Sequence, residues 1–65
     1  MKLVIDWRSA EEVPYGYIEI MKVYEDGSKW PIAYLDSDLS PKSIRNATKL
    51  FARSLEIEKI EEIKK

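Results

Sequence analysis

The chain has 65 residues, no cysteine, no histidine and a net charge of −1. This length allows a single domain over residues 1–65, and the missing residue types exclude disulfides, thiolate or imidazole metal ligands and a histidine general base. No apolar run reaches the roughly 20 residues of a membrane span, and the first residues lack a signal-peptide core, so we expect a cytoplasmic protein without membrane contact.

The first predicted element is a strand at residues 2–8, in the stretch KLVIDWR, where successive side chains point to opposite faces. Residues 9–12 have the spacing of a helix start. Because Pro14 follows too soon for a helix, we expect a single turn or a loop there.

A β-hairpin is predicted next. Residues 17–24 are rich in aromatic and β-branched side chains, Asp26-Gly27 is typical of a tight turn, and residues 30–35 form the returning strand. Pro31 cannot donate a backbone hydrogen bond, so the returning strand should be a sheet edge. The first strand then pairs with the other side of residues 17–24, which makes a three-stranded antiparallel sheet.

A helix should begin at Ser40-Pro41, with serine as the N-cap and proline at the first helical position. At 100° per residue, one side of this helix is apolar and the opposite side is basic. The apolar stripe contains Ile44, Ala47, Thr48, Phe51 and Leu55, and the basic stripe contains Lys42, Arg45, Lys49 and Arg53.

The C-terminal residues change the phase of this pattern. Ile57, Ile60 and Ile63 fall on a different helical face from Phe51, while the alternation at 55–58 also fits a strand. Because no Gly or Pro interrupts the segment, we expect the helix to continue with a bend or a second short helix near 54–57. The predicted fold is therefore α+β, with the order β-β-β-α.

The sequence does not favour catalysis or a cofactor. Asp36 and Asp38 resemble the start of a calcium loop, but Pro41 takes the place of its turn glycine and Ala47 that of its bidentate glutamate. Paired carboxylates such as Glu11-Glu12 lie in predicted turns, where solvated acids are ordinary, and no glycine loop for a nucleotide is present. We predict a non-enzymatic protein without metal, cofactor or small-molecule substrate.

Large apolar side chains on both faces of the predicted sheet favour a protein-binding function. One amphipathic helix covers a single face, so the other remains available to a partner unless the C-terminal segment folds over it. Tyrosine and tryptophan are also frequent in interface hot spots. The candidate interface residues are Trp7, Tyr17, Tyr24, Trp30, Tyr34, Ile57, Ile60 and Ile63.

We therefore expect a protein-binding adaptor or inhibitor that also forms a homodimer. Very short domains without cysteine or recognisable motifs are typical of proteins with which viruses and mobile elements block host machinery. The alternative is a nucleic-acid-binding module that uses the basic stripe. Residues 1–40 carry four cations and eight carboxylates, net −4, whereas residues 41–65 carry seven cations and four carboxylates, net +3. The same stripe could dock an acidic protein, or form the solvated side of the helix.

Overall fold

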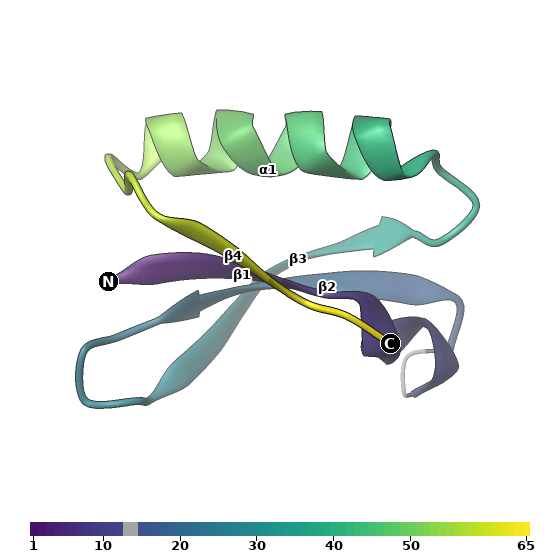
Figure 1. The fold of residues 1–65 in the computed structure, drawn as a ribbon, viewed down its shortest axis with the longest axis horizontal. Coiled ribbons are helices and arrows are strands. Elements are labelled where there is room, and N and C mark those ends of the chain that lie inside the picture. Colours follow the sequence, from purple (N-terminus) through teal and green to yellow (C-terminus); the bar gives the residue numbers. More distant parts are fainter. Residues whose placement is uncertain (13–14) are drawn as a thin grey trace.

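The computed structural model describes residues 1–12 and 15–65, so the predicted effect of Pro14 lies outside the described residues. A helix lies across one face of a small sheet (Figure 1). In chain order the elements are β1 (Lys2–Asp6), the 3₁₀ turn η1 (Trp7–Glu11), β2 (Tyr17–Val23), β3 (Lys29–Asp36), α1 (Pro41–Ser54) and β4 (Ile60–Ile63).

The sheet has four strands in the order β3-β2-β1-β4. β1, β2 and β3 pair antiparallel, with Ile5 opposite Ile20 and Ile20 opposite Ala33, as the hairpin pattern predicts. β3 is an edge strand, in agreement with the position of Pro31, and the register shifts next to this proline. The turn between β2 and β3 contains Gly27 at φ +89°.

β1 is shorter than predicted because Asp6 ends it. The Asp6 carboxylate accepts a hydrogen bond from the backbone nitrogen of Arg8 at 3.1 Å, and the chain turns there into η1. Ser9 then ties η1 to β2, since its hydroxyl oxygen accepts from the Glu19 nitrogen at 2.7 Å. The same hydroxyl lies 2.6 Å from the Asp6 carbonyl oxygen, to which it donates.

The predicted continuation of the helix beyond residue 54 is wrong. α1 ends at Ser54, and residues 60–63 form a fourth strand that pairs parallel with β1, with Leu3 opposite Ile60 and Asp6 opposite Ile63. The sheet is therefore mixed, not purely antiparallel, and the observed order is β-β-β-α-β.

The helix ends in a two-bond cap centred on Glu56. The Ile57 nitrogen donates to the Ala52 carbonyl at 2.8 Å, and the Glu56 nitrogen donates to the Arg53 carbonyl at 3.2 Å. This pair of hydrogen bonds is the Schellman motif, which needs a left-handed residue and usually has glycine there. Glu56 takes that conformation with φ 57°, so the sequence contains no glycine to mark the helix end.

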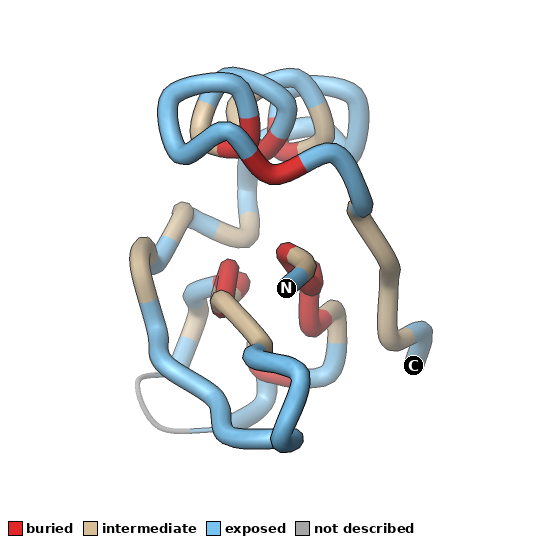
Figure 2. The backbone as a smooth tube through the Cα atoms, turned by 90° about the vertical axis from the view of Figure 1, so that its left-hand side faces the viewer, coloured by how far each residue is buried: buried red, intermediate tan, exposed pale blue. Residues whose placement is uncertain are grey.

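The hydrophobic core lies between α1 and the sheet, where the buried residues face each other (Figure 2). Ile5, Ile18 and Ile20 pack with Ile44 of α1, and Ile57 packs with Leu3 and Ala52. Of the predicted apolar stripe, Ile44 and Thr48 are buried, Ala47 and Phe51 are half-buried, and Leu55 lies beyond the end of α1 and is exposed. Ala52, which was outside the predicted stripe, is buried. β4 extends the sheet at its edge, and no helix or strand in the described residues covers the face opposite α1 (Figure 1).

Candidate functional site

The β2–β3 hairpin holds most of the exposed aromatic surface. Five of the seven aromatic side chains belong to it or to the loop just before it, and their exposed fractions run from 38% to 80%. They are Tyr15, Tyr17, Tyr24, Trp30 and Tyr34. Four of the eight predicted interface residues are in this set, so the structure brings half of the predicted interface together on one hairpin.

The aromatic residues of the hairpin strands lie on both of its faces. Tyr17 and Tyr34 share the face opposite α1 with Glu19, which is paired directly with Tyr34. A hydrogen bond to Glu19 raises the pKa of the Tyr34 phenol. Trp30 is paired with Lys22 on the other face, and the Lys22 ammonium lies 5.0 Å from the centre of the Tyr24 ring.

The centre of the open sheet face is less accessible than the sequence indicates. Val4 and Met21 are opposite each other on this face, and both are buried. Long charged side chains surround them: Lys2 of β1 forms an ion pair of 2.6 Å with Glu61 of β4, directly beside Val4. The accessible apolar surface of this face therefore belongs to Tyr17, Tyr34 and the exposed Pro31, with smaller parts from the half-buried Val23 and Ile63.

The other predicted interface residues are structural or lie at the opposite edge of the sheet. Ile57 is buried in the core, and Ile60 packs against it from β4. Ile63 is half-buried beside Asp6. The spacing of these three isoleucines fits one face of a helix. Because α1 ends at Ser54, Ile57 instead lies in the core, and Ile60 and Ile63 belong to the edge strand β4.

Trp7 belongs to a polar network at the C-terminal edge of the sheet. Its indole nitrogen donates to Glu62 at 2.7 Å, and the Arg45 guanidinium lies 5.2 Å from the ring centre. Glu62 also accepts from Arg45 at 2.9 Å and from Lys64 at 2.9 Å. The hydrogen bonds from these three donors lower the pKa of Glu62 to about 2, with Arg45 the largest cause.

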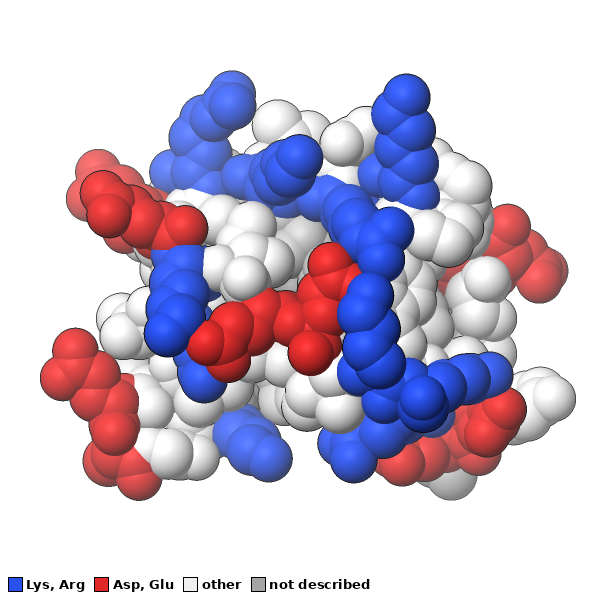
Figure 3. Space-filling view, in the orientation of Figure 1, with Lys and Arg blue, Asp and Glu red and all other residues white. Residues whose placement is uncertain are grey.

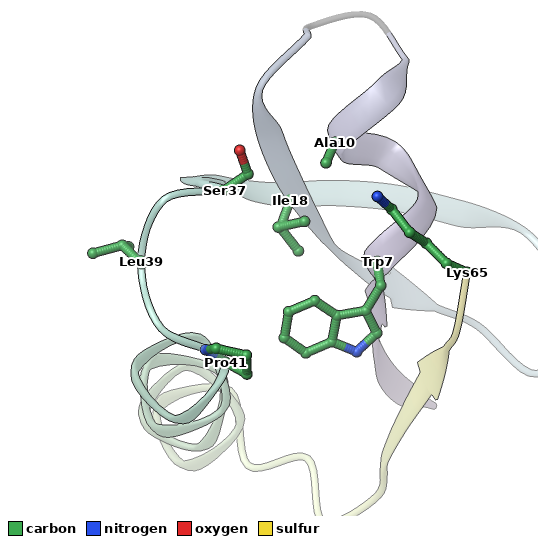
Figure 4. A pocket seen from close by; sticks show the side chains of 7 residues that line it. All are labelled: Trp7, Ala10, Ile18, Ser37, Leu39, Pro41 and Lys65. Carbon is green, nitrogen blue, oxygen red and sulfur yellow. The ribbon is translucent and has the colours of Figure 1, made fainter.

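A pocket of about 340 Å³ opens beside Trp7 (Figure 4). In this view the indole lies beside Pro41, at the start of α1, and below Ile18 on β2, while the Lys65 side chain extends toward Ala10 on η1. The sequence did not predict this pocket, because its walls come from four separated segments of the chain.

Asp36 and Asp38, which resemble the start of a calcium loop, form a simple turn between β3 and α1. In this turn the Asp36 carboxylate accepts a hydrogen bond from the Asp38 backbone nitrogen at 2.8 Å.

The basic stripe of α1 is divided in two. Lys42, Lys49 and Arg53 are exposed, and in the described parts of the chain none of them has an ion-pair partner. Arg45 instead turns toward Trp7 and is neutralised by Glu62. The upper edge of Figure 3, over α1, shows the basic side chains that remain available.

Within residues 1–12 and 15–65, no helix is long and apolar enough to span a membrane. Comparisons of the chain with protein-family models, with curated proteins and with solved structures found no match. The exposed hairpin, the basic side of α1 and the pocket beside Trp7 are the features of the molecule that indicate a function.

Proposed function

We propose that the chain is a small non-enzymatic protein-binding module, an adaptor or an inhibitor, that binds its partner through the β2–β3 hairpin. The observation that carries this proposal is the group of five exposed aromatic side chains on the β2–β3 hairpin and the loop just before it. Tyrosine and tryptophan bury a large rigid surface and retain a polar group for hydrogen bonding, so they are frequent in the centres of interfaces.

The charges of the hairpin indicate what kind of partner it binds. Residues 15–38 contain five carboxylates and two lysines, net −3. An acidic surface with aromatic rings attracts a cationic protein surface through complementary charge and cation–π contacts. A second copy of the chain is one such partner, since its α1 presents Lys42, Lys49 and Arg53.

Site-specific photo-crosslinking tests the proposal. A benzophenone amino acid replaces Tyr34 or Trp30, and the protein is irradiated in a lysate of its source organism. Leu50 is the matched control, because it is apolar and 60% exposed but lies on the outer side of α1. We expect adducts with a different protein from positions 34 and 30 and few from position 50, whereas a homodimer that pairs the hairpin with α1 should give dimer adducts from position 50 as well.

The mass of the adduct distinguishes the partners. An adduct of twice the mass of the chain identifies a homodimer, which light scattering of the purified protein should then confirm. Adducts of equal yield from all three positions with a protein other than a second copy, or none from the hairpin, would contradict binding through the hairpin.

Nucleic-acid binding is the second candidate, and the unpaired cations of α1 favour it. Three phosphate contacts from Lys42, Lys49 and Arg53 would give log K a slope of about −2.7 against log salt for duplex DNA. A gel shift at two salt concentrations measures this, with Arg45→Gln as a control, because Arg45 is paired with Glu62. No shift at low salt would exclude this function.

A further inference from the structure

The pocket beside Trp7 brings together residues that are far apart in the sequence. η1, β2, the β3–α1 connection and the end of the chain each contribute to it. Its volume of about 340 Å³ lies at the lower end of the range of small-ligand sites. Trp7, Ala10, Ile18 and Leu39 make its lining mainly apolar.

The indole that forms part of the wall is held in place on two sides. Its nitrogen donates to Glu62 at 2.7 Å, and the Arg45 guanidinium lies over the ring. The indole N–H is therefore occupied, and the ring offers its carbon surface to a ligand. A wall that is already ordered before binding lowers the entropic cost of binding.

A cation is available where the pocket opens to solvent. Lys65 lines the pocket, and its ammonium lies 2.8 Å from Glu11 of η1. The two side chains of this ion pair are 57% and 70% exposed, so the pair is weak and the ammonium can exchange partners.

The surroundings of the pocket add positive charge. A smaller hollow of about 110 Å³ shares Trp7 and Pro41 with the pocket and is lined by Arg45 and Lys64. Arg45 and Lys64 both pair with Glu62, and Lys65 pairs with Glu11, so these ion pairs contain three cations and two carboxylates.

We propose that this pocket binds a small amphipathic monoanion, an aromatic or branched aliphatic carboxylate. The apolar part of the ligand lies against Trp7, Ile18 and Leu39, and its carboxylate pairs with the Lys65 ammonium in place of Glu11. Lys65 is the single charged side chain among the described residues that line the pocket, which matches one negative charge, whereas the nearby carboxylates repel a polyphosphate. The inference is independent of partner binding by the β2–β3 hairpin.

Titration with 3-phenylpropionate tests this assignment on the ¹⁵N-labelled chain. The two tryptophans give separate indole N–H signals, so Trp7 reports on the pocket and Trp30 is an internal control. We expect saturable shifts at Trp7, Ser37, Leu39 and Lys65, none at Trp30, and a Kd of roughly 1–10 mM for a ligand of this size.

Neutral 3-phenylpropionamide and cationic 3-phenylpropylamine separate charge from hydrophobicity. We expect the amide to bind up to about fivefold more weakly and the amine not to saturate, because an exposed ion pair is worth at most about 1 kcal/mol and the ligand gives up none of its own pairs when it replaces Glu11. Lys65→Gln should reduce the affinity for the carboxylate by a similar factor. Lys59→Gln is the matched control, because Lys59 is exposed and paired with Glu61 instead.

Two results would overturn the proposal. Shifts that appear equally at Trp30 and Tyr34 would mean nonspecific contact with exposed aromatic rings. Equal affinity of the acid, the amide and the amine would mean that no charge recognition occurs.

Discussion

Replacing Glu56 with glycine should stabilise the protein. Glu56 has φ 57°, and a residue with a side chain in this left-handed region costs about 1–2 kcal/mol, a cost that glycine does not have. Glycine also gives the unfolded chain more freedom, which offsets roughly 0.5–1 kcal/mol of the gain. The free energy of unfolding should therefore rise by about 0.5–1 kcal/mol, and Tm by about 2–8 °C for a domain of this size.

Urea denaturation followed by circular dichroism measures this change. Glu58→Gly is the matched control, because Glu58 is also exposed, carries the same charge and is not among the positive-φ residues of the described chain. We expect the control to lose up to about 1 kcal/mol. If both variants lose stability equally, Glu56 is not left-handed in solution, and the end of α1 at Ser54 is contradicted.

Two further predictions concern the polar contacts that join the ends of the chain to the sheet. The pKa of Glu62 is lowered from 4.5 to about 2, so its contacts stabilise the fold fully above about pH 4.5 and lose that contribution as the pH falls through about 2. Between about pH 4.5 and 2, the unfolding free energy of the Glu62→Gln variant should accordingly change less than that of the parent protein. If acid titrations give the same dependence of the unfolding free energy on pH for both proteins, a role for Glu62 is refuted. Ser9→Ala leaves the Glu19 backbone N–H without its acceptor and should lower the unfolding free energy by about 1–3 kcal/mol in urea titrations, whereas Ser43→Ala, at an exposed position, should change it by less than about 1 kcal/mol. A loss of the same size at both serines would show that the Ser9 bridge is unimportant.

The hairpin and the start of the helix could be predicted because local chemistry decides them. Asp26-Gly27 turns the chain, and the buried Ile44 and Thr48 match the apolar side of the predicted helix. The serine N-cap is also as predicted, since the Ser40 hydroxyl accepts from the Ser43 nitrogen at 3.1 Å. Backbone freedom, capping and side-chain spacing act over a few residues, so the sequence contains them directly.

The candidate sites were only partly predictable. Tyr17, Tyr24, Trp30 and Tyr34 could be selected from the composition of the hairpin, and all four are exposed, whereas Tyr15, the most exposed tyrosine, was not selected. Trp7 has the same residue type, but its surroundings depend on Glu62, which is 55 residues away along the chain. Spacing along the sequence contains no signal for that contact, or for the pocket that surrounds it.

The sequence by itself determined the hairpin, the N-terminus of the helix, its amphipathic character and the lack of cysteine and histidine chemistry. Only the tertiary structure decided that the last residues leave the helix. In that segment the local preference for continued helix competes with the burial of Ile57 against Leu3 and with the hydrogen bonds between β4 and β1. These contacts join residues more than fifty positions apart, so no local pattern in the sequence could reveal them. Their combined free energy exceeds the cost of the left-handed conformation of Glu56.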